Sequence, residues 1–520
     1  MRAAHIEAMS SSNHKVAVAT TSQLAAEAAQ EVADLGGNAV DCGIAADMCS
    51  INTQPGVCAL AGSAFVTVWL PDGEAITIDG NVAVPGKGLS DSSPKIERVV
   101  LEYGGGVETL VGASSVAVPG TLAALYLASE RFGKLAWRDL MAPSIRAARN
   151  GFPLAAACHY YLGYAGDVIY GRSTDGHSAL HHDDGSLRDA GSNIIVPHLA
   201  DSLDTIAREG QSVFYQGDLG QRIVAFVQDQ GGMLTMEDLT SYEASVLPAL
   251  QVNVGDWQIA TNPPPAIGGV NLAAMLHSFG TRSLKQWDDE SRLRLIRTQE
   301  AVMRYRQARL DTVDDVSEPA RRFLELASSE LLISKWSSGS TVHTSAVDGL
   351  GAACSITASS GYGAGEMAPG TGIWLNNCLG ELELNRRGLD AGPPGRRLPS
   401  NMAPGCARSG SSVLAMGSPG ADRITTALHQ FLVNFLQLGL ELDAAVAHPR
   451  LHLKIDESGD ELALEPGIPV PDISINIRRY DDISMYFGGV VAALYDRDEG
   501  FVASADPRRE GGTYIGPESA

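Results

Sequence analysis

A change of pattern near residue 340 constrains the fold of this chain more than any other feature of the sequence. Residues 199–230 and 285–333 have the spacing of helices, whereas β-branched residues alternate along 342–348 and 352–358. The segment 348–351 between the alternating runs, Asp-Gly-Leu-Gly, has the composition of a hairpin turn. Helical and antiparallel segments in one chain predict an α+β fold in which helices and sheets form separate layers.

One compact unit is expected in spite of the length. A chain of 520 residues could form several domains, but no linker rich in Pro, Gly or Ser separates the helical part from the strands. The 56 glycines exceed the average share of about 7% and stand in short clusters between apolar runs. This distribution predicts many tight turns and places where the backbone approaches a ligand closely.

Charge and hydropathy exclude several classes of partner. The formal net charge is −23, from 61 acidic and 38 basic residues, and an anionic surface repels phosphate backbones and acidic lipids. We therefore expect neither nucleic acid nor a membrane as a partner. No apolar run is long enough to span a bilayer, and Met1 to Val16 lack the apolar core of a signal peptide. A cytoplasmic protein is the resulting prediction.

Metal and cofactor sites find little support in the sequence. The seven cysteines include no Cys-x-x-Cys pair, so a structural zinc site is not expected. The run His181–His182–Asp183–Asp184 is followed by Gly185, and we interpret it as a solvated loop. No phosphate-binding glycine motif occurs, and the glycines of 361–365 lack the strand-to-helix setting of a dinucleotide loop. The prediction is that the protein uses no cofactor and no metal.

The segment that points to chemistry is the small polar run 337–340, which ends at Thr341, where a strand begins. Cleavage between Ser340 and Thr341 would create an α-amino group on the residue that also carries a hydroxyl nucleophile. An α-amino group has a pKa of about 7.7–8.0, so it can act as a general base near neutral pH without a histidine. The alternative interpretation is an ordinary Ser/Gly loop that enters a strand, and these residues alone favour that alternative.

Two further features favour catalysis. Folding the strands back at the hairpin turn places Thr341 opposite Ala358 and beside Thr357, a second hydroxyl. The strand 411–416 runs into Gly-Ser-Pro-Gly-Ala-Asp and a helix, so the N–H groups of Gly420 and Ala421 would lie at a helix N-terminus, where they can stabilise an oxyanion. Each feature also has a common structural meaning, as a β-favouring threonine and as a glycine-rich turn.

Several short motifs recur in a specific order along nearly the whole chain. They are GGNAVD at 36–41, VPGT at 118–121, RNGFP at 149–153, PPP at 263–265 with Gly268–Gly269, GIWLNN at 372–377, GSPG at 417–420 and DPRR at 506–509. In this order and spacing, they resemble the γ-glutamyltranspeptidase family of N-terminal-nucleophile hydrolases.

This resemblance implies a four-layer αββα sandwich made as one precursor. Self-cleavage between Ser340 and Thr341 would give a large chain, 1–340, and a small chain, 341–520, which stay together as one compact unit and can form a further homo-oligomer. Thr341 falls on the family's nucleophile, Thr357 on the second threonine that supports it, and Gly420 with Ala421 on the oxyanion hole. Ala421 replaces a glycine, but its backbone donor is kept.

The positions that would bind substrate depart from the family. The arginine that holds the glutamyl carboxylate should fall near Ser90, and no arginine occurs between residues 3 and 97. The remaining family positions are occupied by Ser359, Cys378, Glu381, Ser400 and Asn401. Losing a bidentate carboxylate clamp is a large change. Arg396, Arg397 or Arg423 could replace that clamp from the small chain, although each alone is better interpreted as a surface charge or a structural residue.

The resulting prediction is a threonine amidase or acyltransferase that acts on a small-molecule acyl substrate. A γ-glutamyl compound is the family default. The altered binding positions leave open a different acyl group, as in acylases, an oxamate-type amidohydrolase or C–C hydrolases of biosynthetic pathways. A non-catalytic relative that only binds its ligand is the alternative from another class of protein.

Overall fold

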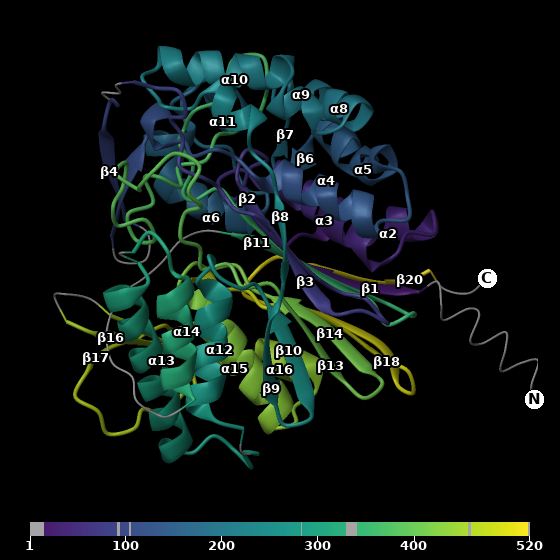
Figure 1. Cartoon of the computed structure of the whole chain (residues 1–520), viewed down its shortest axis with the longest axis vertical. Helices are drawn as coiled ribbons and strands as arrows, with labels where there is room; N and C mark the ends of the chain where they lie inside the picture. Colours follow the sequence, from purple (N-terminus) through teal and green to yellow (C-terminus); the bar gives the residue numbers. More distant parts are fainter. Residues whose placement is uncertain are drawn as a thin grey trace, which may run out of the picture.

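The computed structural model of this chain describes residues 15–90, 94–102, 106–281, 283–311, 313–328, 341–455 and 459–517. The predicted cleavage residue Ser340 and the polar start of the chain lie outside these residues. Two β-sheets pack face to face, and helices cover the outer side of each sheet (Figure 1). This arrangement confirms the predicted α+β class and its four αββα layers.

The first sheet has seven strands in the described ranges, in the order β20-β1-β11-β12-β2-β3-β8, and all neighbours are antiparallel. Its strands are β20 (Gly512–Gly516), β1 (Val16–Thr20), β11 (Val342–Asp348), β12 (Ala353–Ser359), β2 (Ser63–Trp69), β3 (Ala75–Gly80) and β8 (Ser245–Pro248). Strands from the beginning, the middle and the end of the chain lie side by side. The change of pattern near residue 340 therefore does not separate two folding units.

The second sheet is also antiparallel, and its order within the described ranges is β19-β18-β14-β13-β10-β9. Its strands are β19 (Gly500–Ala505), β18 (Val491–Asp496), β14 (Ser412–Gly417), β13 (Gly405–Ser409), β10 (Trp257–Thr261) and β9 (Leu250–Val254). Small and apolar side chains from both sheets, among them Ala17, Val347, Ala353, Cys406 and Ala415, form one buried cluster between them.

Helices complete the two outer layers (Figure 1). The first sheet is covered by α2 (Gln23–Asp34), α3 (Ala39–Thr53) and α4 (Thr121–Phe132), and α5 (Trp137–Asn150) packs on α3. The second is covered by α12 (Gly268–Phe279), α15 (Arg423–Leu432) and α16 (Leu442–Ala447), and α13 (Asp289–Arg309) and α14 (Ser317–Ala327) pack on α12.

The structure contains further helical segments and strands. The helical ones are η2 (Ala113–Ser115), α6 (Ala156–Ala165), η3 (Gly166–Tyr170), α7 (Thr174–Leu180), α8 (Leu199–Glu209), α9 (Ser212–Tyr215), α10 (Asp218–Asp229), α11 (Met236–Thr240), η4 (Val433–Gln437) and η5 (Met485–Phe487). The strands are β4 (Glu97–Leu101), β5 (Val107–Val111), β6 (Phe152–Pro153), β7 (Asn193–Ile194), β15 (Leu451–Lys454), β16 (Glu461–Leu464) and β17 (Asn476–Arg479).

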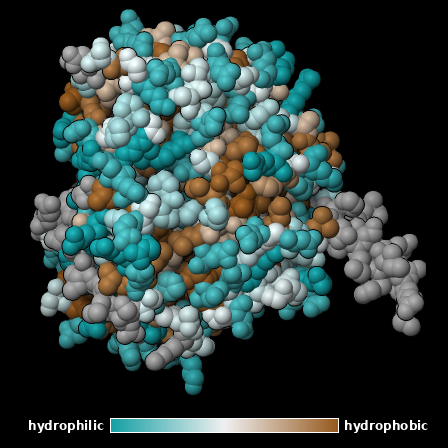
Figure 2. All heavy atoms as spheres, viewed as in Figure 1, coloured by the Kyte–Doolittle hydropathy of each residue, from teal (hydrophilic) through white to brown (hydrophobic). Residues whose placement is uncertain are grey.

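Apolar and polar residues are distributed unevenly on the surface. Figure 2 shows apolar side chains gathered across the middle of the visible face, at the level of the edge strands β8 and β9, and mostly hydrophilic residues over the helical layers. Among the helices of the described ranges, none combines the length and the apolar character that crossing a bilayer requires.

The register of the central hairpin differs by one residue from the sequence-based prediction. Val342 pairs with Ala358 and His343 pairs with Thr357, so the prediction that Thr341 lies opposite Ala358 is wrong. The cause is the turn, because the N–H of Asp348 donates to the carbonyl of Ala352 at 3.0 Å, one residue later than expected.

Successive side chains along β11 and β12 point alternately to the two faces of the first sheet, so every second residue faces the second sheet. Ser345 donates its hydroxyl proton to the carbonyl oxygen of Val491 at 3.1 Å, and Ser355 donates to that of Met416 at 2.9 Å. Both carbonyls belong to the second sheet, so every second residue from Ser345 and Ser355 faces it. Thr341 and Thr357 therefore share the inner face and are diagonal neighbours across the hairpin.

On the outer face of the same hairpin, α3 places one carboxyl group in the core. Asp47 is fully buried beside Thr344, and burial raises its pKa to about 8. An unfolded aspartate ionises near pH 4, so the folded chain holds a proton that the unfolded chain releases between those values. Stability contributed by the protonated form is complete below about pH 4 and is lost as the pH rises towards 8.

Asp47→Asn should remove this pH dependence, because the amide has no proton to lose. We expect the free energy of unfolding of the wild type to fall by about 1.4 kcal/mol per pH unit more steeply than that of the variant between about pH 5 and 7.5. Urea unfolding at several pH values measures it. Asp34→Asn, the same change at the exposed end of α2, serves as the control and should keep the wild-type slope. Parallel pH profiles for wild type and Asp47→Asn would contradict the assignment.

Candidate active site

A small cavity opens where the hairpin strand β11 begins. Thr341 and Ala421 line it together with every substrate-binding residue that the sequence predicted. The complete lining is Ser63, Asn81, Val82, Thr341, Ser359, Cys378, Glu381, Leu384, Pro399, Ser400, Asn401, Met402, Ala421 and Ile424. Residues from both parts of the chain, before and after Thr341, thus form one site.

The two threonines lie on the inner face at the mouth of the hairpin. Thr341 precedes β11 and is 3% exposed, in contact with the cavity. Thr357 is fully buried behind the lining, and its Oγ1 lies 2.7 Å from Nδ1 of His343. Sequence reasoning missed His343, although the same alternation that places Thr341 on the inner face also places His343 there. Burial lowers the pKa of this histidine to about 3, so the ring is neutral at working pH.

The turn between β14 and α15 has the backbone of an anion site. Gly420 has φ of +117°, and a Cβ at this position would lie 2.7 Å from the Cα of Gly488, so only glycine fits. Ala421 has φ of 63°, a left-handed conformation that costs a non-glycine residue about 1–2 kcal/mol. Within the described residues, the N–H of neither Gly420 nor Ala421 donates to a backbone carbonyl. Both donors are therefore available to a ligand.

A buried ion cluster holds this turn from the second helical layer. Arg306 of α13 is fully buried, and its guanidinium contacts Asp311 at 3.0 Å and Asp422 at 2.8 Å. The side-chain amide of Asn401 donates to the same Asp422 oxygen at 2.6 Å. Asp422 directly follows Ala421, so these contacts fix the position of the turn. Asn401 both lines the cavity and anchors the turn.

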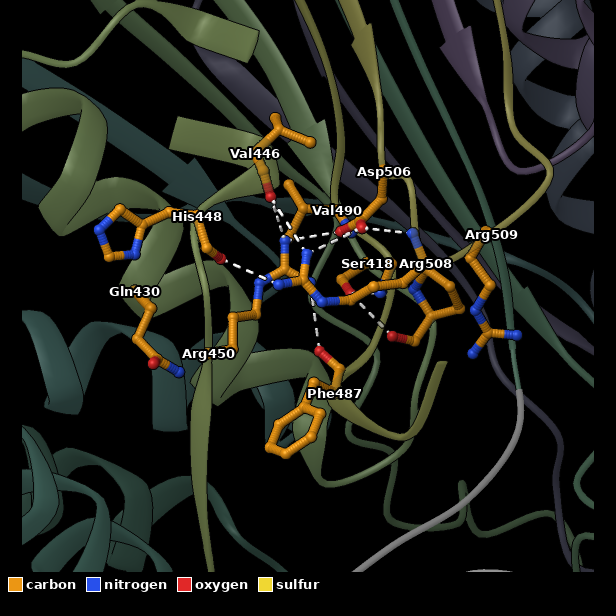
Figure 3. A network of polar contacts seen from close by, with 12 residues as sticks. Ser418, Gln430, Val446, His448, Arg450, Phe487, Val490, Asp506, Arg508 and Arg509 are labelled. Carbon is orange, nitrogen blue, oxygen red and sulfur yellow. Dashed lines mark hydrogen bonds and ion pairs between the residues drawn. The ribbon is translucent and has the colours of Figure 1, made fainter. Parts of the chain in front are cut away.

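The late DPRR motif braces the turn from the other side (Figure 3). Asp506 lies between two arginines, with Nη2 of Arg450 at 2.6 Å and Nη1 of Arg508 at 3.0 Å, and it accepts a hydrogen bond from the N–H of Val490 at 2.7 Å. Nη1 of Arg450 also donates to the carbonyl of Phe487 at 3.2 Å. The network thereby fixes the loop that contains Gly488, which packs directly against Gly420.

The cavity has an acidic character. Glu381 lines it and is 4% exposed, and burial together with the nearby Glu383 raises the pKa of Glu381 well above its usual range. Burial also raises the pKa of Glu383 to about 7, and Tyr362 donates its hydroxyl to that carboxyl group. No arginine or lysine is among the lining residues in the described part of the chain.

None of the arginines proposed to replace the missing clamp lines the cavity. Arg396 donates to the carbonyl of Val313 at 2.7 Å, and Arg397 donates to the carbonyls of Asn81 and Glu243 at 2.9 and 2.6 Å. Nε of Arg423 donates to the carbonyl of Tyr486 at 2.8 Å. All three bind backbone carbonyls, as the structural interpretation predicts. Ser90, where the family arginine was expected, is exposed at the end of the first described range.

The histidine and aspartate run at 181–184 is only in part the solvated loop that the sequence suggested. His181 is buried and stacks on His177 with ring centroids 4.5 Å apart, whereas residues 182–186 are exposed. Within the described residues, no three His, Cys, Asp or Glu side chains are grouped so that they could hold a metal ion.

Comparison with known proteins assigns the fold and the family. The solved cephalosporin acylase from Bacillus halodurans has a TM-score of 0.80 and 24% identity, over 96% of this chain and 95% of that one. The two chains therefore share one fold. The sequence model described as Gamma-glutamyltranspeptidase matches residues 25–516. The chain belongs to the gamma-glutamyltranspeptidase family and is an enzyme of this hydrolase and transferase kind.

Two curated relatives carry different names. The glutathione hydrolase proenzyme of Pseudomonas aeruginosa is 30% identical over 477 residues, which cover 84% of this chain and 82% of that protein. The acylase ACY 1 proenzyme of Pseudomonas sp. strain V22 is 28% identical over 530 residues, which cover 95% and 92%. Both names describe proenzymes, one a glutathione hydrolase and the other an acylase.

Arg306→Met should test how strongly the turn depends on its buried ion cluster. The variant leaves two buried carboxyl groups without their cation, so we expect the free energy of unfolding to fall by about 3–5 kcal/mol. Arg304→Met on the same helix loses its ion pairs to Glu300 and Asp460, which are less deeply buried, and should cost less than about 2 kcal/mol. Urea unfolding compares the two. Equal losses would show that the cluster has no special role.

Proposed function

We propose that this chain is a precursor that cleaves itself before Thr341 and then works as a threonine amidase or acyltransferase. The large chain would be 1–340 and the small chain 341–520. The observation that carries the proposal is one cavity lined by both Thr341 and Ala421, beside a turn with two unused backbone donors. A nucleophile and an oxyanion site on the same cavity are what acyl transfer needs.

The first reaction would be the cleavage of the chain itself. Oγ1 of Thr341 attacks the carbonyl carbon of Ser340, and the C–N bond between the two residues breaks as the nitrogen takes up a proton. The resulting ester between Ser340 and the threonine hydroxyl is hydrolysed by water. The products are a carboxylate on Ser340 and a free α-amino group on Thr341.

The second reaction would use that amino group as the general base. It takes the proton of the Thr341 hydroxyl, directly or through water, while Oγ1 attacks the acyl carbonyl of the substrate. The N–H groups of Gly420 and Ala421 stabilise the oxyanion. The C–N bond of the substrate then breaks, and the leaving amine takes the proton. Water or an acceptor amine releases the acyl group from Thr341 by the same steps.

The cavity favours an acyl group without a free carboxylate. A carboxylate placed there would find no arginine or lysine, and an unpaired buried charge costs roughly 2–5 kcal/mol. Glu381 instead suits an ammonium group, because a cation would supply the partner that its carboxyl group lacks. An acyl group that is neutral or carries an amine therefore fits better than a glutamyl group. The curated relatives include proteins named acylases as well as glutathione hydrolases.

A second candidate, a family member that binds without catalysis, is less well supported. The binding positions have changed, but Thr341, Thr357 and both backbone donors of the turn are retained. A protein that only binds would have no use for a strained left-handed Ala421 beside the cavity.

Thr341→Ala should abolish self-cleavage, since no hydroxyl remains to attack the Ser340 carbonyl. Denaturing electrophoresis of the purified wild type should show two chains, and the variant should show one. Thr341→Ser keeps the hydroxyl and should still yield two chains. A single band for the wild type under all maturation conditions, with Thr341→Ala equally active, would disprove the proposal.

Two anilide substrates that differ only in the α-carboxylate test whether the cavity lacks a partner for that carboxylate. The 4-aminobutyryl anilide is the γ-glutamyl anilide without its α-carboxylate. We expect kcat/KM for the 4-aminobutyryl compound to exceed that for the glutamyl compound by at least about 30-fold, which corresponds to the lower limit of the cost of an unpaired carboxylate. Efficient, saturable release from the glutamyl anilide would show that glutamyl specificity survives without the arginine.

Glu381→Gln tests whether Glu381 binds the ammonium group of the substrate. Because the raised pKa keeps Glu381 protonated at lower pH, an ammonium substrate must displace that proton to bind. KM for the 4-aminobutyryl anilide should therefore fall as the pH rises in the wild type and stay level in Glu381→Gln. A butyryl anilide, which has no amine, should show no such difference between the two proteins.

A further inference from the structure

The ring of His343 links three groups on the inner face of the hairpin. Nδ1 lies 2.7 Å from the hydroxyl oxygen of Thr357, and Nε2 lies 3.0 Å from that of Ser345. The Ser345 oxygen in turn lies 3.1 Å from the carbonyl oxygen of Val491. All four residues are fully buried, so the groups must satisfy one another.

Counting protons fixes the direction of this chain of hydrogen bonds. A carbonyl only accepts, so the single proton of the Ser345 hydroxyl goes to Val491. The Ser345 oxygen must then accept from His343, which places the ring proton on Nε2. Nδ1 is left as an acceptor and receives the hydroxyl proton of Thr357. The other tautomer would set the Ser345 oxygen against the Val491 carbonyl without a proton between them.

The surrounding backbone locks the ring in this position. A Cβ on Gly417 of β14 would lie 2.0 Å from Cε1 of His343, so the ring fills the space that a side chain would take. Glycine at 417 thus permits the close approach of the second sheet to the ring. The close approach of Gly417 and the hydrogen bonds at both ring nitrogens hold the ring against turning over.

We propose that His343 is a positioning residue: its Nδ1 accepts the hydroxyl proton of Thr357. Towards Thr341, the Thr357 oxygen then acts as a hydrogen-bond acceptor and not as a donor. This inference rests on the proposed function, in which Thr341 is the nucleophile. Thr341 is the diagonal neighbour of Thr357 on the inner face, so on this proposal its hydroxyl would donate to Thr357 in the precursor, and its α-amino group would do so after cleavage. A Thr357 hydroxyl that donated to Oγ1 of Thr341 would instead occupy a lone pair of the nucleophile and weaken its attack.

Ser345→Ala tests the proposal at a position that touches neither threonine. Without the serine, a proton on Nε2 has no acceptor, so the ring should carry its proton on Nδ1 and donate to Thr357, which reverses the bond. We expect kcat to fall about 10- to 100-fold with KM nearly unchanged. Ser355→Ala is the matched control, because Ser355 pairs with Ser345 in the hairpin, is equally buried and also donates to a carbonyl. It should change kcat less than about threefold.

The tautomer itself can be observed by nitrogen NMR of histidine-labelled protein. The His343 signals, assigned by their loss in His343→Asn, should show the proton on Nε2 in the wild type and on Nδ1 in Ser345→Ala. His343→Asn keeps an acceptor near Nδ1 and should retain more activity than His343→Leu, which has none. Comparable thermal unfolding of the two serine variants excludes a loss of fold as the cause.

The outcomes separate this inference from the proposed function. A wild-type proton on Nδ1, or equal kcat for Ser345→Ala and Ser355→Ala, would overturn the role of His343 while leaving Thr341 as the nucleophile. The NMR measurement can also be made on Thr341→Ala, so it stands even if that variant turns out to be active and the proposed function fails.

Discussion

The site depends on the polar end of the interface between the two sheets. Over most of this interface, small apolar side chains pack together, whereas hydroxyl groups and a histidine face the second sheet near Thr341. Buried hydroxyl groups must be paired, and here they bond to backbone carbonyls of the facing sheet. The contact that joins the sheets therefore also orients the groups beside Thr341, the proposed nucleophile.

Buried charges hold the turn between β14 and α15, where we propose that an oxyanion binds. Arg306 reaches Asp422 from the helical layer, and the Asp506 network holds the loop against Gly420 from the other side. Buried ion pairs add little net stability compared with apolar packing, but removing one partner is costly. This property suits a turn whose position matters, because the site tolerates few rearrangements of its backbone donors.

The sequence predicts those parts of the structure that depend on local spacing. The hairpin, the glycine turn and the layered α+β class follow from alternation and turn residues, and the motif order indicates the family. The predicted register of the hairpin is wrong by one residue, because the N–H of Asp348 donates to the carbonyl of Ala352. The composition of the turn does not determine which residues make this hydrogen bond. The left-handed φ of Ala421 was not predictable, since alanine avoids that conformation.

Contacts between distant residues are the part that could not be predicted. Arg306 and Asp422 are 116 residues apart in the chain, and no local pattern connects them. His343 lies two positions from Thr341, and its role depends on Thr357 and Val491, which folding brings together. The absence of arginine from the described cavity lining is likewise a result of folding, because Arg396, Arg397 and Arg423 bind backbone carbonyls elsewhere.

The central claim is that Thr341 becomes the N-terminal nucleophile of a separate small chain. Intact-mass analysis after reaction with an acyl-trapping electrophile tests it most directly. We expect a chain with the mass of residues 341–520 plus one acyl adduct, located on its first residue by fragmentation. A chain that stays unprocessed, or an adduct on any residue other than Thr341, would contradict it.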